Sequence, residues 1–228
     1  MRELTIQDDR NCRLTVPLCE PVTMENKVIL YKREFPEKSI SLSLRLLSIG
    51  SDIHQIHEWV NQEYAKRFWQ LDGQPISNLI QTYEYIQSSD YAQSYITLLN
   101  DKPVGQIDLY HALHDEVGKL YEAEGGDYGL HLLMAPPKTR IPQLTICVFQ
   151  TFLEYLFSFP EVNRVIGEPD ADNHQANTLV RKLGFQFQKR IKMSYKTANL
   201  YFCTRESFEK AMNTHMLNQK LPMRSNSL

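Results

Sequence analysis

The segment from Asn163 to Phe185 constrains the fold more than any other part of the chain. It opens with a short apolar stretch, residues 163–167, which is typical of a buried strand. The acidic turn Glu168-Pro169-Asp170 follows, and then a helix that begins at Asn173 or His174. Gly184 fits the position just past the end of that helix, where glycine is favoured. A buried strand, a tight turn and a helix in succession indicate an α/β layout.

The remaining periodicities predict a mixed, mostly antiparallel central sheet flanked by helices. Apolar–polar alternation predicts strands at 27–35, 40–47, 94–99, 104–110, 128–134, 185–194 and 200–204. Helical spacing predicts helices at 52–69, with Asp52 as N-cap, and at 77–88, 144–157 and 205–216. We expect a strand-rich N-terminal extension at 1–39, one domain at 40–216 and a polar tail at 217–228.

Composition narrows the classes of partner. The formal net charge is −2 and charged residues are spread along all 228 positions, so we expect neither nucleic acid nor an anionic membrane as partner. No stretch approaches the roughly 20 apolar residues of a membrane span, and the N-terminus has no apolar signal-peptide core. We therefore expect a cytoplasmic chain. His54 and His57 share no face with a third ligand, so we expect no metal.

Asn173, Ala176, Gly184 and Phe185 carry a resemblance to a known family. Their spacing resembles the N-x-x-A and G-F pattern of the GNAT acetyltransferases, in which acyl-CoA enters between two separating strands. The resemblance implies a GNAT fold with acetyl-CoA or another acyl-CoA as co-substrate. The alternative is that Asn173 only caps a helix.

The resemblance also implies a set of acyl-CoA contacts. The backbone of the strand at 128–134 pairs with pantetheine, and the loop at 138–143 holds the pyrophosphate at a helix N-terminus. This loop departs from the family pattern because it contains no glycine, and Pro142 removes a backbone donor. The expected cofactor-binding residues are Leu132, Leu133, Met134, Lys138, Arg140, Gln143, Leu144, Asn173 and Ala176.

A further set of motifs narrows the resemblance to one branch. A strand histidine at His131, the acidic strand end at 168–170 and the aromatic helix positions Trp59 and Trp69 are similar to the siderophore acyltransferases that act on hydroxylysine and related amines. The resemblance covers roughly residues 40–205. It implies His131 and Asp170 as the catalytic pair. The expected substrate-binding residues are Trp59, Trp69, Asp108, Tyr110, His111 and Glu168.

These residue types suit acyl transfer to nitrogen. A thioester is already electrophilic, so the enzyme must align a neutral nitrogen and remove a proton, which a histidine can do near neutral pH. We expect the acceptor to be the N-hydroxy nitrogen of a hydroxylated diamine or lysine, and the protein to be a monomer or homodimer. Two alternatives stay open: acetylation of another amine, such as an aminoglycoside or a protein N-terminus, and a non-catalytic binding domain.

Each of these residues also has an interpretation without a functional role. A lone strand histidine is more often packed than catalytic. Carboxylates such as those of Asp108, Glu122 and Glu124 are more often solvated than ligand-binding, and helix tryptophans are more often core.

Overall fold

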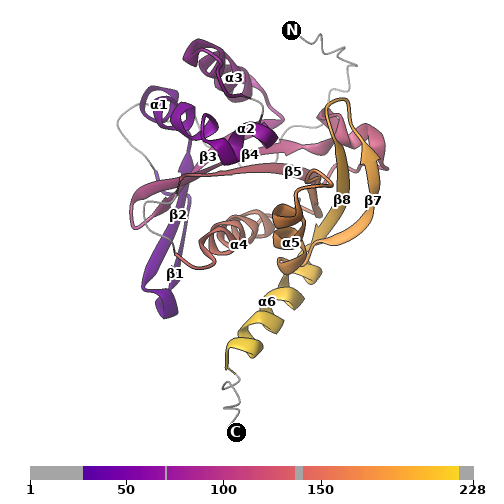
Figure 1. Ribbon diagram of the computed structural model, residues 1–228. Coiled ribbons are helices and arrows are strands. Elements are labelled where there is room, and N and C mark those ends of the chain that lie inside the picture. The colour runs from indigo at the N-terminus through magenta and orange to yellow at the C-terminus, as the bar shows by residue number, and fades with distance from the viewer. Residues whose placement is uncertain (1–27, 70, 137–140, 221–228) are drawn as a thin grey trace, which may run out of the picture.

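The computed structural model describes residues 28–69, 71–136 and 141–220, with only the backbone described at 67, 68 and 215–220. Its centre is an eight-stranded sheet in the order β1-β2-β3-β4-β5-β6-β8-β7 (Figure 1). Among the described strands, β5 and β6 run parallel and the other neighbours are antiparallel. This confirms the predicted mixed, mostly antiparallel sheet. The strands are β1 (Tyr31–Phe35), β2 (Ile40–Leu46), β3 (Ala92–Leu99), β4 (Lys102–His111), β5 (Asp127–Met134), β6 (Arg164–Gly167), β7 (Gln186–Lys192) and β8 (Thr197–Thr204).

Helices cover both faces of the sheet. On one face lie α1 (Ile49–Val60), α2 (Glu63–Trp69) and α3 (Ile76–Ser88), and on the other lie α4 (Leu144–Phe157) and α5 (His174–Lys182) (Figure 1). α6 (Arg205–Lys220) follows β8 and projects away from the sheet. Short 3-10 turns occur at Pro36–Lys38, Ala112–His114 and Val117–Leu120. No helix in the described ranges is both long and apolar enough to cross a bilayer.

Strand alternation divides the core into two layers. Buried residues such as Leu44, Ile107 and Leu109 pack with the apolar helix α4 on one face. Ile96, Leu98 and Leu133 pack with α1 and α3 on the other face. Because successive side chains of a strand point to opposite faces, each position of β4 and β5 belongs to one layer only.

β5 and β6 separate soon after they meet. Asp127 to Gly129 pairs with Arg164 to Ile166, and β5 then continues to Met134 with no β6 partner in the described chain. β4 accompanies β5 along this length, from His111 opposite Tyr128 to Gly105 opposite Met134. The edge of β5 that faces β6 is therefore unpaired over the length where the two strands separate.

A buried asparagine fixes the turn that follows β6. Asn177, 4% exposed, donates to the carbonyl oxygens of Asp170 and Asn173, both at 2.8 Å. Its side-chain oxygen accepts from Asn199 Nδ2 at 2.8 Å and from Tyr201 Oη at 3.0 Å, which tie α5 to β8. All polar atoms of this buried amide are thus occupied, so it holds the turn in one geometry.

The predicted helix at 52–69 is two helices. α1 begins at Ile49, after the N-cap Ser48, and ends at Val60. Asn61 breaks the run, because its Nδ2 donates to His57 O at 2.7 Å and its Oδ1 accepts from Gly73 N at 2.9 Å. Such side-chain bonds to the backbone compete with helix continuation.

The predicted N-cap role of Asp52 is wrong. Its carboxylate accepts two bonds from Arg45, at 2.6 and 2.8 Å, and one from Ser48 N at 2.9 Å. The side chains of Arg45 and Asp52 are 3% and 4% exposed, so this is a buried bidentate ion pair that joins β2 to α1.

We expect Asp52→Ala to lower the free energy of unfolding by about 3–5 kcal/mol, because the change leaves the Arg45 charge buried and unpaired. Denaturant unfolding measures the loss, and Asp72→Ala, at an exposed turn position, is the control. Equal stability of the two variants would contradict a structural role for the pair.

Candidate active site

A row of polar side chains crosses three strands on the face that carries α1, α2 and α3. Ser94 of β3 lies opposite Asp108 of β4, and Asp108 lies opposite His131 of β5. On the same face, the next residues along β3 and β5 are Ile96 and Leu133, which are apolar and buried in the core. Residues opposite each other in a sheet have their Cβ atoms about 5 Å apart, so the fold brings together Asp108 and His131, two of the predicted site residues.

His131 is bonded to a carboxylate at the end of β6. Its Nε2 lies 2.9 Å from Oε1 of Glu168, and the two side chains are 41% and 3% exposed. Lys196, in the turn between β7 and β8, places its Nζ 3.6 Å from the same oxygen. The site therefore contains a chain of charges, Lys196 to Glu168 to His131, in which the imidazole is the exposed end.

The pair shifts both pKa values in favour of the charged forms. Burial disfavours the imidazolium, but the hydrogen bond and negative charge of Glu168 outweigh it and raise the pKa of His131. Burial also disfavours the carboxylate of Glu168, yet its bond with His131, together with Lys196, lowers the pKa of Glu168. A histidine in this setting gains a proton more readily than a free one, which suits a proton acceptor.

Asp170 does not occupy the position expected for the partner of His131. Its Oδ1 accepts from Asp172 N at 2.8 Å, which is a local turn bond. Its backbone forms an isolated bridge with Ala198. Both carboxylates follow β6, but the first of them, Glu168, is the one that reaches the strand histidine.

Two aromatic rings enclose the imidazole. The rings of Tyr110 and His131 lie 5.2 Å apart, and the ring of Trp69 meets His131 edge-on at 6.2 Å. Tyr110 lies flat against Gly129, where a Cβ would come within 2.1 Å of its ring. Gly129 therefore makes room for Tyr110 beside His131. Burial, followed by the charge of Glu168, raises the pKa of Tyr110 well above its ordinary value, so the hydroxyl keeps its proton.

Asp108 is held by its neighbours. Ser94 Oγ and Gln106 Nε2 both donate to its Oδ1. Burial raises the pKa of Asp108, while these donors and the nearby His131 oppose that rise. Asp108 is half-buried and lies opposite His131 in the sheet, so both side chains belong to the same face.

His111 and Trp59, two predicted substrate-binding residues, lie elsewhere. His111 is fully buried, hydrogen-bonded to Gly125 O at 2.7 Å, and meets the ring of Tyr128 edge-on. It directly follows Tyr110 in β4, so alternation sends it to the opposite face. Trp59 is 3% exposed in the core formed by α1 and α3. Neither side chain can line a pocket at His131.

The free edge of β5 presents backbone groups to the opening. Ala135 N donates to Val104 O at 2.8 Å, and alternation then directs the backbone groups of Leu133 toward β4 and those of Leu132 and Met134 toward β6. The carbonyl of Met134 accepts from Tyr64 Oη of α2 at 2.5 Å. The side chain of Leu133 packs with α1 and α3, whereas those of Leu132 and Met134 pack on the α4 side.

The N-terminus of α4 lies at the same end of β5. Gln143 adopts a left-handed backbone, φ 62°, and Leu144 begins the helix. Gln143 Oε1 accepts from Lys38 at 3.4 Å. Pro142 lies in the turn before the helix. Lys138 and Arg140 lie outside the described residues.

Asn173 is the N-cap of α5. Its Oδ1 accepts from Ala176 N at 3.0 Å, as the bland interpretation holds. The side-chain nitrogen Nδ2 of Asn173 has no bond to any residue that the structure describes, so its two N–H groups are left for a ligand. Gly184 has φ +91° directly after the helix, as its predicted position requires.

Three residues of the site were not predicted from the sequence: Ser94, Gln106 and Lys196. Ser94 and Gln106 occupy strand positions where polar residues ordinarily face solvent. Lys196 stands in a turn, where a lysine is unremarkable. The pairing of β8 with β6 is the only signal that could have placed Lys196 beside Glu168, and strand order is not encoded in local patterns.

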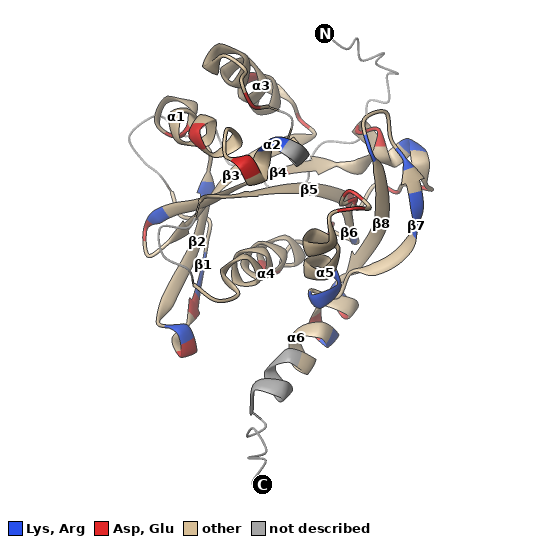
Figure 2. Cartoon of the chain, in the orientation of Figure 1, with Lys and Arg blue, Asp and Glu red and all other residues tan. Residues whose placement is uncertain are grey.

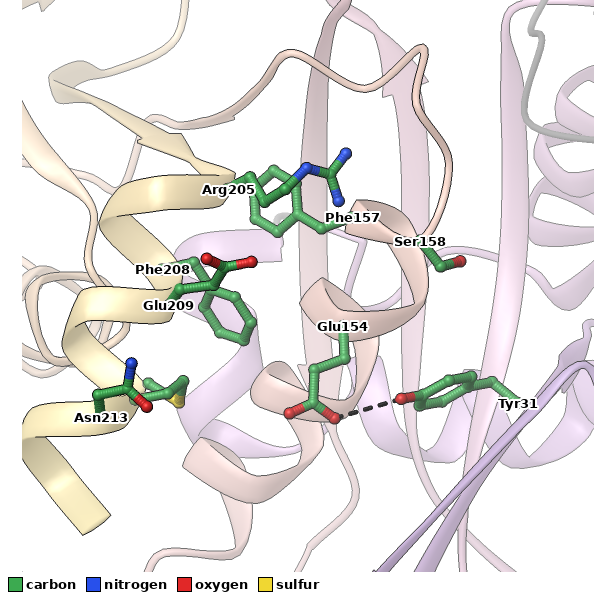
Figure 3. A pocket seen from close by; sticks show the side chains of 9 residues that line it. Tyr31, Glu154, Phe157, Ser158, Arg205, Phe208, Glu209 and Asn213 are labelled. Atoms are coloured by element: carbon green, nitrogen blue, oxygen red, sulfur yellow. Dashed lines mark hydrogen bonds between the residues drawn. The ribbon is translucent and has the colours of Figure 1, made fainter. Parts of the chain in front are cut away.

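A separate hollow lies across the sheet from His131. It measures about 500 Å³ and lies between β1, α4 and α6 (Figure 3). Tyr31, at its wall, donates to Glu154 at 3.4 Å. It contains none of the predicted site residues, so we place the chemistry at the polar row instead.

Comparison with known proteins gives the family of the chain. The family model for the acetyltransferase (GNAT) domain matches residues 48–193, a span that holds the polar row, Glu168 and Asn173. The N-hydroxyputrescine acetyltransferase of Acinetobacter baumannii is 28% identical over 176 residues, 77% of this chain and 83% of that protein. The N(6)-hydroxylysine O-acetyltransferase of Escherichia coli is 26% identical over 180 residues, 78% of this chain but 57% of that protein.

A solved structure agrees with the fold. The aminoglycoside acetyltransferase AAC(6′)-Ib in complex with coenzyme A superposes with a TM-score of 0.67 at 25% identity, covering 74% of this chain and 98% of that one. With the family model spanning well over half of the sequence, the chain belongs to the GNAT acetyltransferase family and is an acyl-CoA-dependent N-acyltransferase.

Proposed function

We propose that the enzyme acylates the N-hydroxy nitrogen of a hydroxylated diamine or lysine and so forms a hydroxamate for siderophore biosynthesis. The observation that carries the proposal is the His131–Glu168 pair, 2.9 Å apart, beside the opening between β5 and β6. Two relatives are named an N-hydroxyputrescine acetyltransferase and an N(6)-hydroxylysine O-acetyltransferase, and both names support a hydroxylated amine as acceptor.

The opening fits an acyl-CoA. Pantetheine needs backbone partners, and the free edge of β5 offers the backbone groups of Leu132 and the N–H of Met134, whose carbonyl already accepts from Tyr64. The pyrophosphate needs donors, and the first-turn N–H groups of α4 lack intrahelical partners, as in any helix. The basic loop residues Lys138 and Arg140 precede that helix. The amide of Asn173 adds a donor across the opening. The bound thioester supplies the activated acyl group.

His131 acts on the acceptor. Its exposed ring accepts the proton that the nitrogen loses as the new C–N bond forms. The C–S bond of the thioester then breaks, and coenzyme A leaves as a thiolate that takes up this proton. Glu168 holds the ring in place and stabilises the imidazolium that results. The N–H of Leu132 lies on the free edge, where it can donate to the thioester carbonyl.

The acceptor pocket is built from groups around the same ring. Trp69 and Tyr110 supply apolar walls on two sides of the imidazole. Asp108 supplies a carboxylate for the cationic end of a diamine or for the α-amino group of a lysine. His111 and Trp59 have no part in this pocket because they face the core.

An aminoglycoside is the second candidate acceptor. The observation in its favour is the likeness to the coenzyme A complex of an aminoglycoside acetyltransferase, at 25% identity. The other carboxylates near His131 are engaged, Glu168 by His131 and Lys196 and Asp115 by the N–H of Val117. The site therefore suits a small amine with one distal charge better than a polycation, so we rank this acceptor second.

We expect Arg140→Ala to weaken coenzyme A binding roughly 10- to 150-fold, because a charge-assisted hydrogen bond contributes about 1.5–3 kcal/mol. Titration calorimetry measures the affinity. Arg190→Ala removes an exposed cation from β7 and is the matched control. If both variants bind like the parent, the phosphate site lies elsewhere.

We expect N-hydroxyputrescine, N-hydroxycadaverine or N-hydroxylysine to be acylated faster at pH 7 than the corresponding parent amines. A lysine-like amine with a pKa of about 10.4 is neutral in roughly one molecule in 2,500 at that pH, whereas a hydroxylamine is largely neutral. Coenzyme A release reports turnover. Faster turnover of kanamycin, or of the parent amines, would favour the second candidate.

We expect His131→Ala to lower kcat by about 100-fold while the affinity for acyl-CoA stays unchanged, because a general base contributes about that much at the low end. Glu168→Gln should cost nearly as much, and the double mutant little more than either, since the residues act together. Asp170→Asn is the matched control, because asparagine keeps the local acceptor for Asp172 N. Full activity of His131→Ala, with folding verified by a thermal melt, would remove the residue from the mechanism.

A further inference from the structure

Lys196 is a nearly buried cation inside a site that must take a cationic substrate. It lies between β7 and β8 and is 16% exposed. Two backbone bonds fix its place: Ala171 N donates to Thr197 O at 2.9 Å, and Asn199 N donates to Pro169 O at 3.0 Å. The start of β8 is thereby tied to the turn after Glu168, which keeps the backbone of Lys196 close to that carboxylate.

A lysine in this position requires a physical reason. Removal of an ammonium from water is costly unless an anion compensates for it. Glu168 is that anion, and the same oxygen, Oε1, contacts Lys196 Nζ at 3.6 Å and His131 Nε2 at 2.9 Å. One buried carboxylate therefore serves two cationic partners, and each partner weakens the hold of the carboxylate on the other.

We propose that Lys196 is a positioning residue that shares the charge of Glu168 with His131 and thereby sets the pH at which His131 accepts a proton. The inference rests on the role of His131 as base in the proposed function. Lys196 itself touches neither substrate nor acyl group in this account and acts through Glu168.

The charges around His131 show why the lysine matters. Asp108 faces the ring from β4, Glu168 from the end of β6 and Asp115 from the segment after β4, and all three carboxylates favour the imidazolium. Tyr110 of β4 stays neutral, and Trp69 of α2 carries no charge. Lys196 opposes the carboxylates and lowers the pKa of His131 relative to what they alone would impose. Without it, His131 stays protonated to a higher pH and cannot act as a base there.

The direct test is an NMR titration of the His131 imidazole in the ligand-free protein between about pH 5 and 9, where histidine titrates. The signal is assigned from its loss in His131→Ala. We expect the pKa of His131 to rise in Lys196→Met and to remain near the parent value in Lys196→Arg. Lys192→Met, which removes an exposed cation from the end of β7, should leave the pKa of His131 unchanged. Glu168→Gln should move it in the opposite direction, downward.

The pH profile of kcat/KM gives the second readout. In Lys196→Met its rise with pH should be displaced to higher pH, with activity lost near neutrality and regained in alkaline solution, whereas a general structural defect lowers the rate at every pH. An unshifted or lowered titration of His131 in folded Lys196→Met would overturn the inference, as would a rate loss of equal size at all pH values. If Lys196→Met does not fold, Lys196→Gln removes the charge with a polar end retained. Failure of the proposed function appears separately, as full activity of His131→Ala.

Discussion

The short parallel contact between β5 and β6 is the constraint on which the rest of the site depends. The two strands pair only over Asp127 to Gly129 and Arg164 to Ile166. Beyond that point β5 remains in the sheet through β4 alone, so its other edge has backbone groups to offer. β6 meanwhile ends in a turn that Asn177 fixes with four hydrogen bonds. The opening is thus a consequence of strand pairing and needs no special loop.

The same divergence explains the placement of charge. Glu168 leaves β6 at the point of separation, where it is buried yet able to reach across to His131 on β5. A buried carboxylate needs donors, and it obtains them from β5 and from the turn between β7 and β8. A second ion pair, Asp127 with Arg164, joins β5 to β6 where the two strands are still paired, and basic residues gather on the edge strand β7 (Figure 2). The polar row of Ser94, Asp108 and His131 lies beside the apolar positions Ile96 and Leu133 of the same layer, and such buried polar groups are expected at a functional site.

The sequence predicted those elements that depend mainly on interactions between neighbouring residues. The strand at 128–134, the helix at 144–157 and the glycine after α5 lie within a residue or two of their predicted places, because alternation, apolar runs and a left-handed turn are encoded in neighbouring residues. The break at Asn61 and the burial of Asp52 depend on partners distant in sequence, Gly73 and Arg45, and were missed. His111 shows a different limit. Strand alternation places His111 and Tyr110 on opposite faces of the sheet. The assignment of His111 to the pocket came from the resemblance and ran against this rule, which the sequence already contained.

The choice between Glu168 and Asp170 depended on the geometry of one turn, which neither pattern nor resemblance resolves.

The central claim is that the acyl group and the nitrogen meet at His131, beside the opening of the sheet. A crystal structure of the protein with coenzyme A and N-hydroxyputrescine tests it most directly. The account predicts pantetheine along the free edge of β5 at Leu132, with the hydroxylamine nitrogen within hydrogen-bonding distance of His131 and the distal ammonium near Asp108. A nitrogen held away from His131, or coenzyme A bound outside the space between β5 and β6, would contradict it.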